Sequence, residues 1–465
     1  MFLQIFKFCT ILMMCAISQP VFATELVVGD DETYTSIQAA VDAASEGDVV
    51  LIKARTDSKG WRENVVINTN NLTIRGDTVA AKANLYDQIC PDVILDGCET
   101  PSAPTSCDRT IMTINATGIS VERLLFRHGE IIFSDTASNV VLKNSCIIGD
   151  NSDVINSEGS VPSAITISSN VFQGGDSESI VLNGDNHVIK DNQFFAIDDG
   201  IKITGDDAQI VNNRIYQSND QGIYIIGDNG LIENNIVIGG EEGIEYKGDN
   251  PTIKGNFVRG MYDDAIYVNC SNCSGGLISH NRLVGSSEGD SGISIDNANN
   301  MMVVSNHVSL ISEEGILFDG GNSIISNNTI LRSGIESSGV GGLTVRGYGN
   351  STIENNLVKY STFIGIEQNE GDGNTYNNNI IFGSGNAGVI IYSGSNTVVN
   401  GNTIKNGLGE GIANIGGTNT VITNNTVTGN RTDICNNASI TTFTGNSNAT
   451  GGTATNCIVD AEEED

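Results

Sequence analysis

Carboxylates recur in pairs just before a Gly-Ile or Ala-Ile step in the sequence. Asp198-Asp199, Glu241-Glu242 and Asp263-Asp264 are the clearest pairs. If successive repeats stack, these side chains lie about 5 Å apart, and each like-charged pair then costs about 0.9 kcal/mol even in water. A cation, a shared proton or splaying into solvent must relieve that repulsion. We call these positions the acidic rib: Asp198, Asp199, Asp220, Glu241, Glu242, Asp263, Asp264, Asp290, Glu313 and Glu314.

Two kinds of chemistry are open to the acidic rib. Ca²⁺ binds several carboxylate oxygens in flexible geometry, so a calcium site is one expectation. Paired carboxyls with separated pKa values can serve as acid and base on a glycosidic bond. The alternative is that these are solvated turn residues without a function. The candidate metal ligands are Asp220, Glu241 and Glu242, and the candidate catalytic carboxyls are Asp198, Asp199, Asp263 and Asp264.

Beside the acidic rib, residues after each Gly-Ile step alternate between apolar and polar types. In a strand, such alternation turns the isoleucines inward and the intervening residues outward. Outward tyrosines can stack on sugar rings, and an outward lysine can act as the base of a lyase beside a uronate that Ca²⁺ neutralises. The alternative is an ordinary exposed strand face. The candidate bases are Lys202 and Lys247, and the candidate substrate-binding residues are Tyr224, Glu245, Tyr267 and Arg346.

The elements that position these residues follow from an internal repeat. An Asn recurs from Asn144 to Asn425 at intervals of 21 to 28 residues, and a Gly-Ile step follows it in most repeats. Each repeat gives short alternating strands separated by Gly, Asn and Asp turns. One such coil cannot bury its inner face alone, but stacked coils pair in parallel and bury a continuous core. Asn suits the corners because it tolerates the left-handed conformation and because its amide can bond to the same Asn in the next coil.

The two ends of the chain differ from the repeats. Residues 1–23 resemble a signal peptide, with Lys7, a short apolar run and Val21-Phe22-Ala23 before the expected cut. The apolar pattern of residues from about 35 to 46 predicts a short amphipathic helix that caps the core, and the apolar run at residues 49–52 predicts the first strand. We therefore predict one domain over residues 24–458 with about 14 coils, roughly 65 to 70 Å long. Residues 459–465 form an acidic tail that we expect to be disordered.

Charge and cysteine content restrict the partners and the compartment. The formal net charge is −33, which argues against nucleic acid and anionic lipid surfaces as partners. No later segment is apolar for long enough to insert into a membrane. Of ten cysteines, Cys9 and Cys15 leave with the signal peptide, and the remaining eight predict disulfides in an oxidising compartment. We expect Cys435 to pair with Cys457 and Cys270 with Cys273, while Cys90, Cys98, Cys107 and Cys146 allow three connectivities.

The opening segment resembles a known superfamily. Residues 34–52, Trp61-Arg-Glu-Asn-Val-Val-Ile67 and Leu72-Thr-Ile-Arg-Gly76 resemble the start of pectate-lyase-like proteins, and the repeats resemble their coils. The resemblance implies an all-β fold, a right-handed parallel β-helix with a short N-terminal capping helix. That superfamily includes lyases, hydrolases, esterases and epimerases that act on polysaccharides, and also non-catalytic adhesins. The catalytic motifs of its pectin methylesterases, polygalacturonases and alginate epimerases have no match here, so the resemblance assigns no catalytic residue.

Two hypotheses of different classes remain open. The first is a secreted protein, extracellular or periplasmic, that binds or acts on an extended and acidic polysaccharide by lyase or glycosidase chemistry, with Ca²⁺ as a candidate cofactor. The second is a non-catalytic β-helix that binds glycan or forms part of a surface or matrix scaffold. The sequence does not decide whether the protein is an enzyme. We expect a monomer, although no feature of the sequence fixes the oligomeric state.

Overall fold

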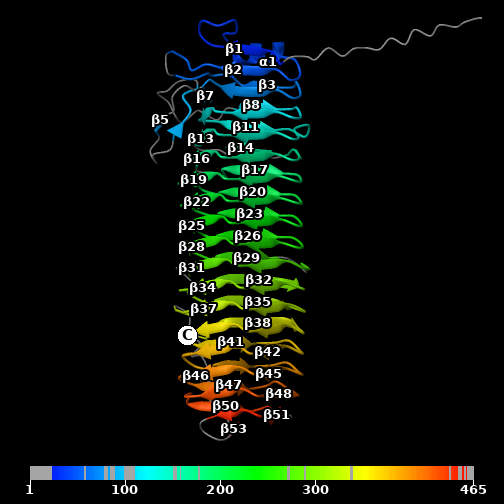
Figure 1. Cartoon of the computed structure of the whole chain (residues 1–465), viewed down its shortest axis with the longest axis vertical. Helices are drawn as coiled ribbons and strands as arrows, with labels where there is room; N and C mark the ends of the chain where they lie inside the picture. The colour runs from blue at the N-terminus through cyan, green and yellow to red at the C-terminus, as the bar shows by residue number, and fades with distance from the viewer. Residues whose placement is uncertain are drawn as a thin grey trace, which may run out of the picture.

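The computed structural model is a long rod built from three parallel β-sheets that run along its axis (Figure 1). It describes residues 23–56, 59–77, 82–83, 89–98, 110–149, 154–157, 159–175, 178–269, 273–286, 290–335, 339–438, 441–448, 453–454 and 457. Each coil contributes one strand to each sheet in turn, and every strand of these sheets pairs in parallel with the same strand of the next coil. The predicted right-handed parallel β-helix is therefore confirmed. Within the described residues, no helix is long and apolar enough to cross a membrane.

The strands are assigned to sheets as follows. The first sheet has 18 strands: β1 (Glu25–Val28), β2 (Val49–Ile52), β4 (Thr73–Gly76), β9 (Ser120–Glu122), β12 (Val141–Lys143), β15 (Thr166–Ser168), β18 (Val188–Lys190), β21 (Gln209–Val211), β24 (Leu231–Glu233), β27 (Thr252–Lys254), β30 (Leu277–Ser279), β33 (Met302–Val304), β36 (Ile324–Ser326), β39 (Thr352–Glu354), β42 (Thr375–Asn377), β45 (Val398–Asn400), β48 (Thr420–Thr423) and β51 (Thr441–Thr444). The second sheet has 16 strands: β7 (Ile94–Asp96), β10 (Leu125–Arg127), β13 (Cys146–Ile148), β16 (Val171–Gln173), β19 (Gln193–Phe195), β22 (Arg214–Tyr216), β25 (Ile236–Gly240), β28 (Phe257–Met261), β31 (Arg282–Ser286), β34 (His307–Ser309), β37 (Thr329–Leu331), β40 (Leu357–Lys359), β43 (Ile380–Phe382), β46 (Thr403–Lys405), β49 (Thr426–Thr428) and β52 (Ser447–Asn448).

The third sheet follows the Gly-Ile steps. Its strands are β3 (Val65–Ile67), β8 (Thr110–Ile114), β11 (Glu130–Phe133), β14 (Ile155–Asn156), β17 (Ile180–Asn183), β20 (Ile201–Thr204), β23 (Ile223–Ile226), β26 (Ile244–Lys247), β29 (Ile266–Asn269), β32 (Ile293–Asn299), β35 (Ile316–Gly321), β38 (Gly341–Gly349), β41 (Ile364–Gln368), β44 (Val389–Ile391), β47 (Glu410–Asn414), β50 (Thr432–Asn436) and β53 (Thr453–Ala454). A small antiparallel pair, β5 (Lys82–Ala83) and β6 (Ile89–Cys90), lies outside the three sheets.

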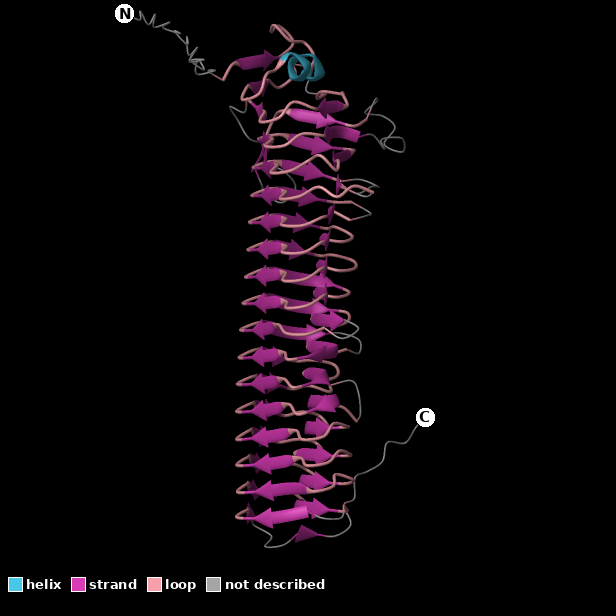
Figure 2. Cartoon of the chain, turned by 90° about the vertical axis from the view of Figure 1, so that its right-hand side faces the viewer, coloured by secondary structure: helices cyan, strands magenta, loops and turns pink. Residues whose placement is uncertain are grey.

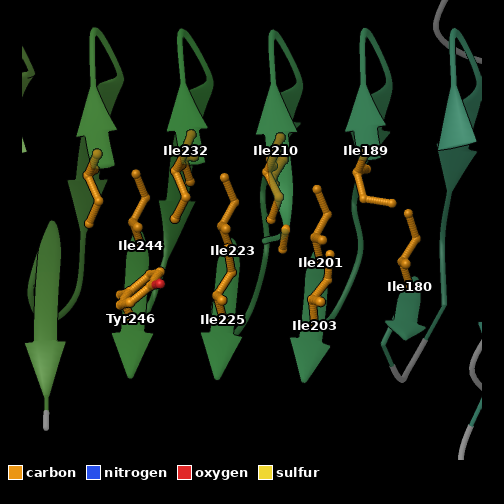
Figure 3. Close-up of a cluster of buried hydrophobic side chains, with 14 of the residues drawn as sticks. Ile180, Ile189, Ile201, Ile203, Ile210, Ile223, Ile225, Ile232, Ile244 and Tyr246 are labelled. Atoms are coloured by element: carbon orange, nitrogen blue, oxygen red, sulfur yellow. The ribbon is translucent and has the colours of Figure 1, made fainter. Parts of the chain in front are cut away.

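The core is a stack of inward isoleucines that repeats from coil to coil. Ile201 and Ile203 of β20 pair with Ile223 and Ile225 of β23, and all four are at most 1% exposed. Figure 3 shows these side chains meeting Ile189, Ile210 and Ile232 of the first sheet across the interior. Burial of each such side chain contributes about 1.5 to 3 kcal/mol relative to exposure. The alternation that predicted inward and outward residues is thus confirmed in the third sheet.

The recurring Asn forms a buried hydrogen-bonded ladder at the corner between the first and second sheets. The Nδ2 of Asn235 donates to Oδ1 of Asn256 at 3.1 Å, and Asn256 donates to Asn281 at 3.0 Å. The left-handed conformation belongs to the residue before each ladder Asn, for example Asn234 with φ 57°. The predicted ladder is confirmed. The sequence prediction gave the left-handed conformation and the ladder amide to one residue, whereas the structure places them on two adjacent residues. Asn144 is itself one of the left-handed residues, and Ser145 holds the ladder position in that coil.

The Gly of each Gly-Ile step is required by close packing at a second corner. A Cβ at Gly222 would lie 2.5 Å from Cγ1 of Val237, and a Cβ at Gly243 would lie 2.4 Å from Cγ1 of Val258. In these coils the turn that carries the acidic rib therefore closes directly onto the second sheet, whereas Ser179 and Ala265 hold the equivalent position in two other coils.

Helix α1 (Ile37–Ala43) covers the N-terminal end of the rod (Figure 2). It lies within the predicted range of 35 to 46 and buries Ile37, Ala40 and Val41. Glu63 of the next coil accepts hydrogen bonds from the backbone N–H groups of Ile37 and Gln38 at 3.0 Å each, so a carboxylate satisfies the helix N-terminus.

The rod has more coils than the sequence predicted. Strand β1 precedes the predicted first strand at residues 49–52, which is β2, and pairs with it. The first coils also lack the ladder Asn from which coils were counted. Eighteen strands in the first sheet correspond to a rod about 80 Å long at the usual spacing of ~4.8 Å. The predicted signal peptide and acidic tail lie outside the described residues, apart from Ala23, which precedes β1.

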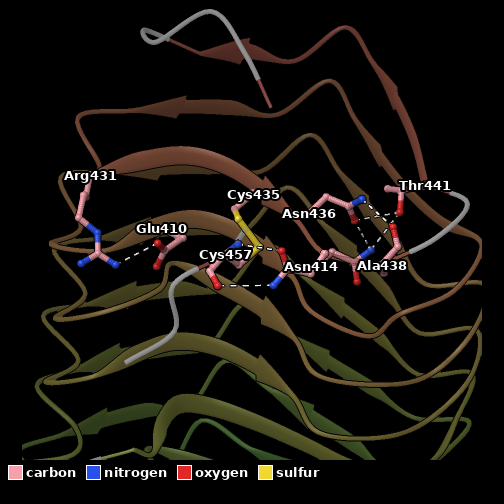
Figure 4. Close-up of a disulfide and its surroundings, with 9 residues drawn as sticks. Glu410, Asn414, Arg431, Cys435, Asn436, Ala438, Thr441 and Cys457 are labelled. Atoms are coloured by element: carbon pink, nitrogen blue, oxygen red, sulfur yellow. Dashed lines mark hydrogen bonds and ion pairs between the residues drawn. A yellow bond between two sulfur atoms is a disulfide. The ribbon is translucent and has the colours of Figure 1, made fainter. Parts of the chain in front are cut away.

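Disulfides fasten segments of the chain together near both ends of the rod. Cys90 is bonded to Cys146, which resolves one pairing that the sequence left open. The predicted Cys435–Cys457 bond is confirmed and fastens the last described residue to β50 (Figure 4). Cys98 and Cys273 are also disulfide-bonded, whereas Cys107 and Cys270 lie outside the described residues.

Candidate functional site

The acidic rib forms two parallel columns in the turns that lead into the third sheet. Register of the paired strands places the second member of each pair in the column nearer the strand: Glu178, Asp199, Gln221, Glu242, Asp264, Ser291 and Glu314. The first members form the column farther from the strand: Asp198, Asp220, Glu241, Asp263, Asp290 and Glu313. The predicted stacking of carboxylates is therefore what the structure has. Glu178 is a member that the sequence pattern missed, because Ser179 replaces the Gly in its coil.

Hydrogen bonds and two neutral residues partly relieve the repulsion within the columns. Gln221 separates two acids of its column; its backbone N–H donates to Oδ1 of Asp199 at 3.2 Å, and its Nε2 donates to Oε2 of Glu242 at 3.2 Å. Ser291 separates Asp264 from Glu314 in the same column, and its backbone N–H donates to Oδ1 of Asp264 at 2.8 Å. The acidic rib is thus partly built into the turn rather than splayed into solvent.

Protonation relieves much of the remaining repulsion. Burial, together with the charges of Asp220, Glu178 and Asp198, raises the pKa of Asp199 to about 7. Asp264 is only 9% exposed, and burial, with the nearby charges of Asp263 and Asp296, raises its pKa well above the usual range. Burial thus favours the protonated form of the Asp264 carboxyl, the form that can donate a proton.

The outward residues of the third sheet form one column across adjacent coils. Lys202, Tyr224, Glu245 and Tyr267 are direct register partners on β20, β23, β26 and β29. Lys247 lies beside this column: its Nζ is 2.9 Å from the Tyr224 hydroxyl and 2.8 Å from Oε1 of Glu245, and it sits over the Tyr224 ring. The sequence-predicted face is present and continuous over these four coils.

Each basic residue of this face is paired with a carboxylate. Lys202 contacts Glu178 at 3.1 Å, Lys247 contacts Glu245, and Arg346 contacts Glu314 at 3.4 Å. Burial opposes the charge of Lys202 and Lys247, but these carboxylate contacts outweigh it and raise the pKa of both lysines. Both lysines therefore stay protonated at neutral pH.

A second set of polar residues joins this face two positions along the strands. The Tyr267 hydroxyl donates to Oδ2 of Asp296 at 3.0 Å. Asp319 pairs in register with Arg346 on the following coil. Asp296 and Asp319 lie at outward positions of their strands. The sequence assigned no role to them, because only the structure shows that Asp296 lies near both Tyr267 and Asp264.

The predicted site residues form a track rather than one compact centre. Lys202 and Arg346 lie on β20 and β38, six coils apart, which is about 29 Å at the usual strand spacing. Asp199 and Lys202 belong to one end of the track, and Asp264, Tyr267 and Asp296 to its middle. The hollow lined by Asn192, Asn213 and Arg214 lies at the Asn corner instead.

Two groups of carboxylates have a geometry that a cation could use. Asp220, Glu241 and Glu242 each place an oxygen within 4.8 Å of the others, as do Asp263, Asp264 and Asp290. The first group contains all three predicted metal ligands. Oxygen donors at this separation suit Ca²⁺. A third group, Asp96, Cys98 and His128, does not fit a metal because Cys98 is disulfide-bonded and offers no thiolate.

Comparison with protein families gives two matches. A family model described as "Right handed beta helix region" matches residues 199–335 and 291–461, which together span more than half of the chain. A model described as "Periplasmic copper-binding protein (NosD)" matches residues 57–257. No curated protein matches the chain.

Many solved structures are similar in fold. A tailspike protein mutant of E. coli bacteriophage HK620 in complex with a pentasaccharide is 10% identical, with a TM-score of 0.48, covering 93% of this chain and 80% of that one. XylC in complex with xylose is 10% identical, with a TM-score of 0.45 and coverage of 77% and 86%. The alginate lyase AlyF-OU02 is 14% identical, with a TM-score of 0.38 and coverage of 93% and 88%. At these identities the similarity is one of coil architecture.

Proposed function

The chain belongs to the right-handed β-helix family, and from that premise we propose that it binds an extended polysaccharide along the outward face of the third sheet and cleaves it by acid–base chemistry. The observation that carries this proposal is the buried Asp264 carboxyl, whose pKa is raised, near Tyr267 and Asp296. The disulfides near both ends of the rod support an exported location, extracellular or periplasmic.

The arrangement favours hydrolysis over elimination. In hydrolysis, Asp264 would give its proton to the glycosidic oxygen as the bond to the anomeric carbon breaks. The Asp296 carboxylate, which the Tyr267 hydroxyl orients at 3.0 Å, would take a proton from the attacking water or attack directly. A lysine that acts as the base of a lyase must be deprotonated, but the raised pKa of Lys202 and Lys247 keeps both lysines protonated. These two residues are better suited to hydrogen bonding with substrate hydroxyls.

Charge on this face restricts the substrate. Lys202, Lys247 and Arg346 are each neutralised by a carboxylate, so the face offers little free positive charge to a polyanion. A neutral glycan can bind directly by stacking on Tyr224 and Tyr267. An acidic glycan would need Ca²⁺ held by Asp220, Glu241 and Glu242, where the ion would bridge protein and substrate carboxylates.

A copper-binding function finds little support in the histidines of the matched region. His187 is buried, with Nδ1 accepting from the Ile165 N–H at 3.2 Å and Nε2 at 3.0 Å from the Asn183 carbonyl oxygen. Both ring nitrogens are thus engaged by the main chain. Nδ1 of His128 contacts Asp96 at 3.0 Å, and the third member of that group is the disulfide-bonded Cys98.

The test is a product assay on the mature protein. It is incubated with neutral and uronate-containing polysaccharides, with Ca²⁺ or with chelator, and the products are read by mass spectrometry. We expect shortened saturated oligosaccharides, and loss of these products in Asp264→Asn. The matched control is Asp207→Asn, an exposed acid in a left-handed turn position where Asn fits equally well.

Each outcome separates the hypotheses. Unsaturated products would show elimination and contradict the hydrolytic assignment. Intact polymer that is nevertheless retained by the protein would leave the non-catalytic glycan-binding scaffold. Ca²⁺-dependent product formation that is lost in Glu242→Gln, or that then needs more Ca²⁺, would assign the ion to the predicted ligands. Products unaffected by chelator would remove Ca²⁺ from the mechanism.

A further inference from the structure

The second sheet has an outward charge opposite to that of the whole molecule. The chain contains 56 acidic and 23 basic residues. Yet the strands of the second sheet from β13 to β52 contain no Asp or Glu, while they carry five basic residues. Those residues are Arg214, Arg259, Arg282, Lys359 and Lys405. An acidic protein therefore presents one face on which the local sign is reversed.

The C-terminal half of this face combines the positive charge with exposed aromatic rings. Lys359, Phe382 and Lys405 are register partners on β40, β43 and β46. Tyr360 follows Lys359, is 52% exposed and makes an edge contact with Phe382 at 5.6 Å between ring centroids. Arg332 belongs to the preceding coil, where its N–H donates to the Lys359 carbonyl oxygen. We call Arg332, Lys359, Tyr360, Phe382 and Lys405 the basic-aromatic patch.

The three cations of the basic-aromatic patch differ from the cations of the third sheet in their ion pairing. Among the described residues, no carboxylate forms an ion pair with Arg332, Lys359 or Lys405. The turns after Lys359 and Phe382, residues 360–363 and 383–388, contain no acid. Glu410, which follows Lys405 at the start of β47, is paired with Arg431, and Glu336, four residues after Arg332, lies outside the described residues. The positive charge of the patch is therefore available to a ligand.

Arg332 and Tyr360 occupy the left-handed position that follows each second-sheet strand, with φ values of 57° and 60°. In the next coils this position holds Gly383, Asn406 and Gly429. Large side chains also occur there outside the patch, at Gln217 and Leu310. The patch is therefore distinguished by its charges and rings, and not by its backbone conformation.

We propose that the basic-aromatic patch binds a strand of anionic polysaccharide, separately from the site on the third sheet. Lys359 and Lys405 are two coils apart, about 10 Å, so a strand along the rod axis meets a cation at intervals. Alternate charged sugars of a polyuronate or sulfated glycan can meet these two lysines, whereas the net charge of −33 disfavours a nucleic acid. The Tyr360 and Phe382 rings between the cations can stack on the apolar faces of sugar rings.

The test compares two triple variants with equal loss of charge. Arg332→Gln/Lys359→Gln/Lys405→Gln removes the cations of the patch. Arg123→Gln/Lys190→Gln/Lys254→Gln is the matched control: it removes three cations of the first sheet and its turns, and Arg123 is also left-handed. Binding to polygalacturonate, neutral dextran and oligodeoxythymidylate is measured by calorimetry at several NaCl concentrations. Chelator is present throughout, so that Ca²⁺ bridging at the acidic rib does not contribute.

We expect the wild type to bind polygalacturonate, with affinity that falls as salt rises. The patch variant should bind at least about tenfold more weakly and with a smaller salt dependence, while the control variant stays near wild type. Tyr360→Asn should also weaken binding, and it keeps the fold because Asn accepts the left-handed conformation. Equal binding by the patch variant and the wild type would overturn the proposal, as would oligodeoxythymidylate bound as tightly as polygalacturonate. Cleavage at Asp264 is measured separately, so failure here leaves the proposed function untouched.

Discussion

Two aspartates in different coils show how the same amino acid takes different states. Burial, together with the charges of Asp220, Glu178 and Asp198, raises the pKa of Asp199 in the acidic rib. Asp96, on β7, is less exposed than Asp264, but its pKa is lowered because His128, the Cys98 N–H and Arg127 bond to it and outweigh burial. The partner groups, rather than burial alone, decide whether a carboxyl stays charged.

The raised pKa of Asp199 predicts a particular pH dependence of stability. Its carboxyl ionises near pH 3.8 when unfolded but near 7 when folded, so the folded state binds more protons in between and the free energy of unfolding falls as pH rises through that window. We expect Asp199→Asn to be more stable than wild type at pH 8 and similar to it near pH 4. Urea unfolding at the two pH values checks this, with Asp207→Asn as the control. A constant difference between variant and wild type at both pH values would contradict it.

At the scale of elements, the ladder Asn and the Gly before the third-sheet strands define each coil. Asn256 accepts from both the N–H and the Nδ2 of Asn235, and it donates to the Ile232 carbonyl oxygen and to Asn281. Four buried hydrogen bonds therefore meet at one side chain. This one amide therefore contributes more hydrogen bonds to the coil corner than a residue that makes a single turn hydrogen bond.

Replacing a ladder Asn should be costly for this reason. Asn256→Ala leaves the buried N–H of Asn235 without its acceptor and leaves Nδ2 of Asn235 with only the Ile210 carbonyl oxygen, which should lower the free energy of unfolding by about 2 to 4 kcal/mol. The control is Asn377→Ala, an outward residue on β42, which should cost much less. Chemical denaturation of the two variants checks the difference, and similar losses for both would show that the ladder is not a major source of stability.

Most of the fold could be predicted from the sequence, because the repeat forces Asn, Gly and Ile into fixed columns. The first coils were not counted because they lack the Asn, as in the coil that begins with β1 at Glu25–Val28. In the first coil that was counted, Ser145 rather than Asn144 holds the ladder position. The acidic rib and the outward column were predicted residue by residue. Their pairings, such as Lys247 with Tyr224 or Tyr267 with Asp296, depend on side-chain directions across coils and could not be read from spacing.

For the whole molecule, charge is distributed by face and not only by amount. The acidic rib borders the third sheet, whereas the second sheet carries basic residues and no acid on its strands from β13 onward. Because all coils share one register, a property placed once per coil becomes a continuous line along the rod. Two different ligands can thus be held along the same axis without competing for one groove.

The parallel pairing of coils also determines how the molecule responds to force. The hydrogen bonds between coils run along the rod axis, so a pull on the two ends loads them one coil after another, as in peeling rather than shearing. We expect the rod to yield in small steps, each releasing about 75 Å of chain for a coil of about 22 residues. The Cys90–Cys146 and Cys435–Cys457 bonds would keep the chain between their cysteines closed, so the coils outside these two segments give way. Single-molecule stretching would check this, and one all-or-none extension would contradict it. Such a rod would lengthen stepwise under load, while the two disulfide-closed segments keep their length.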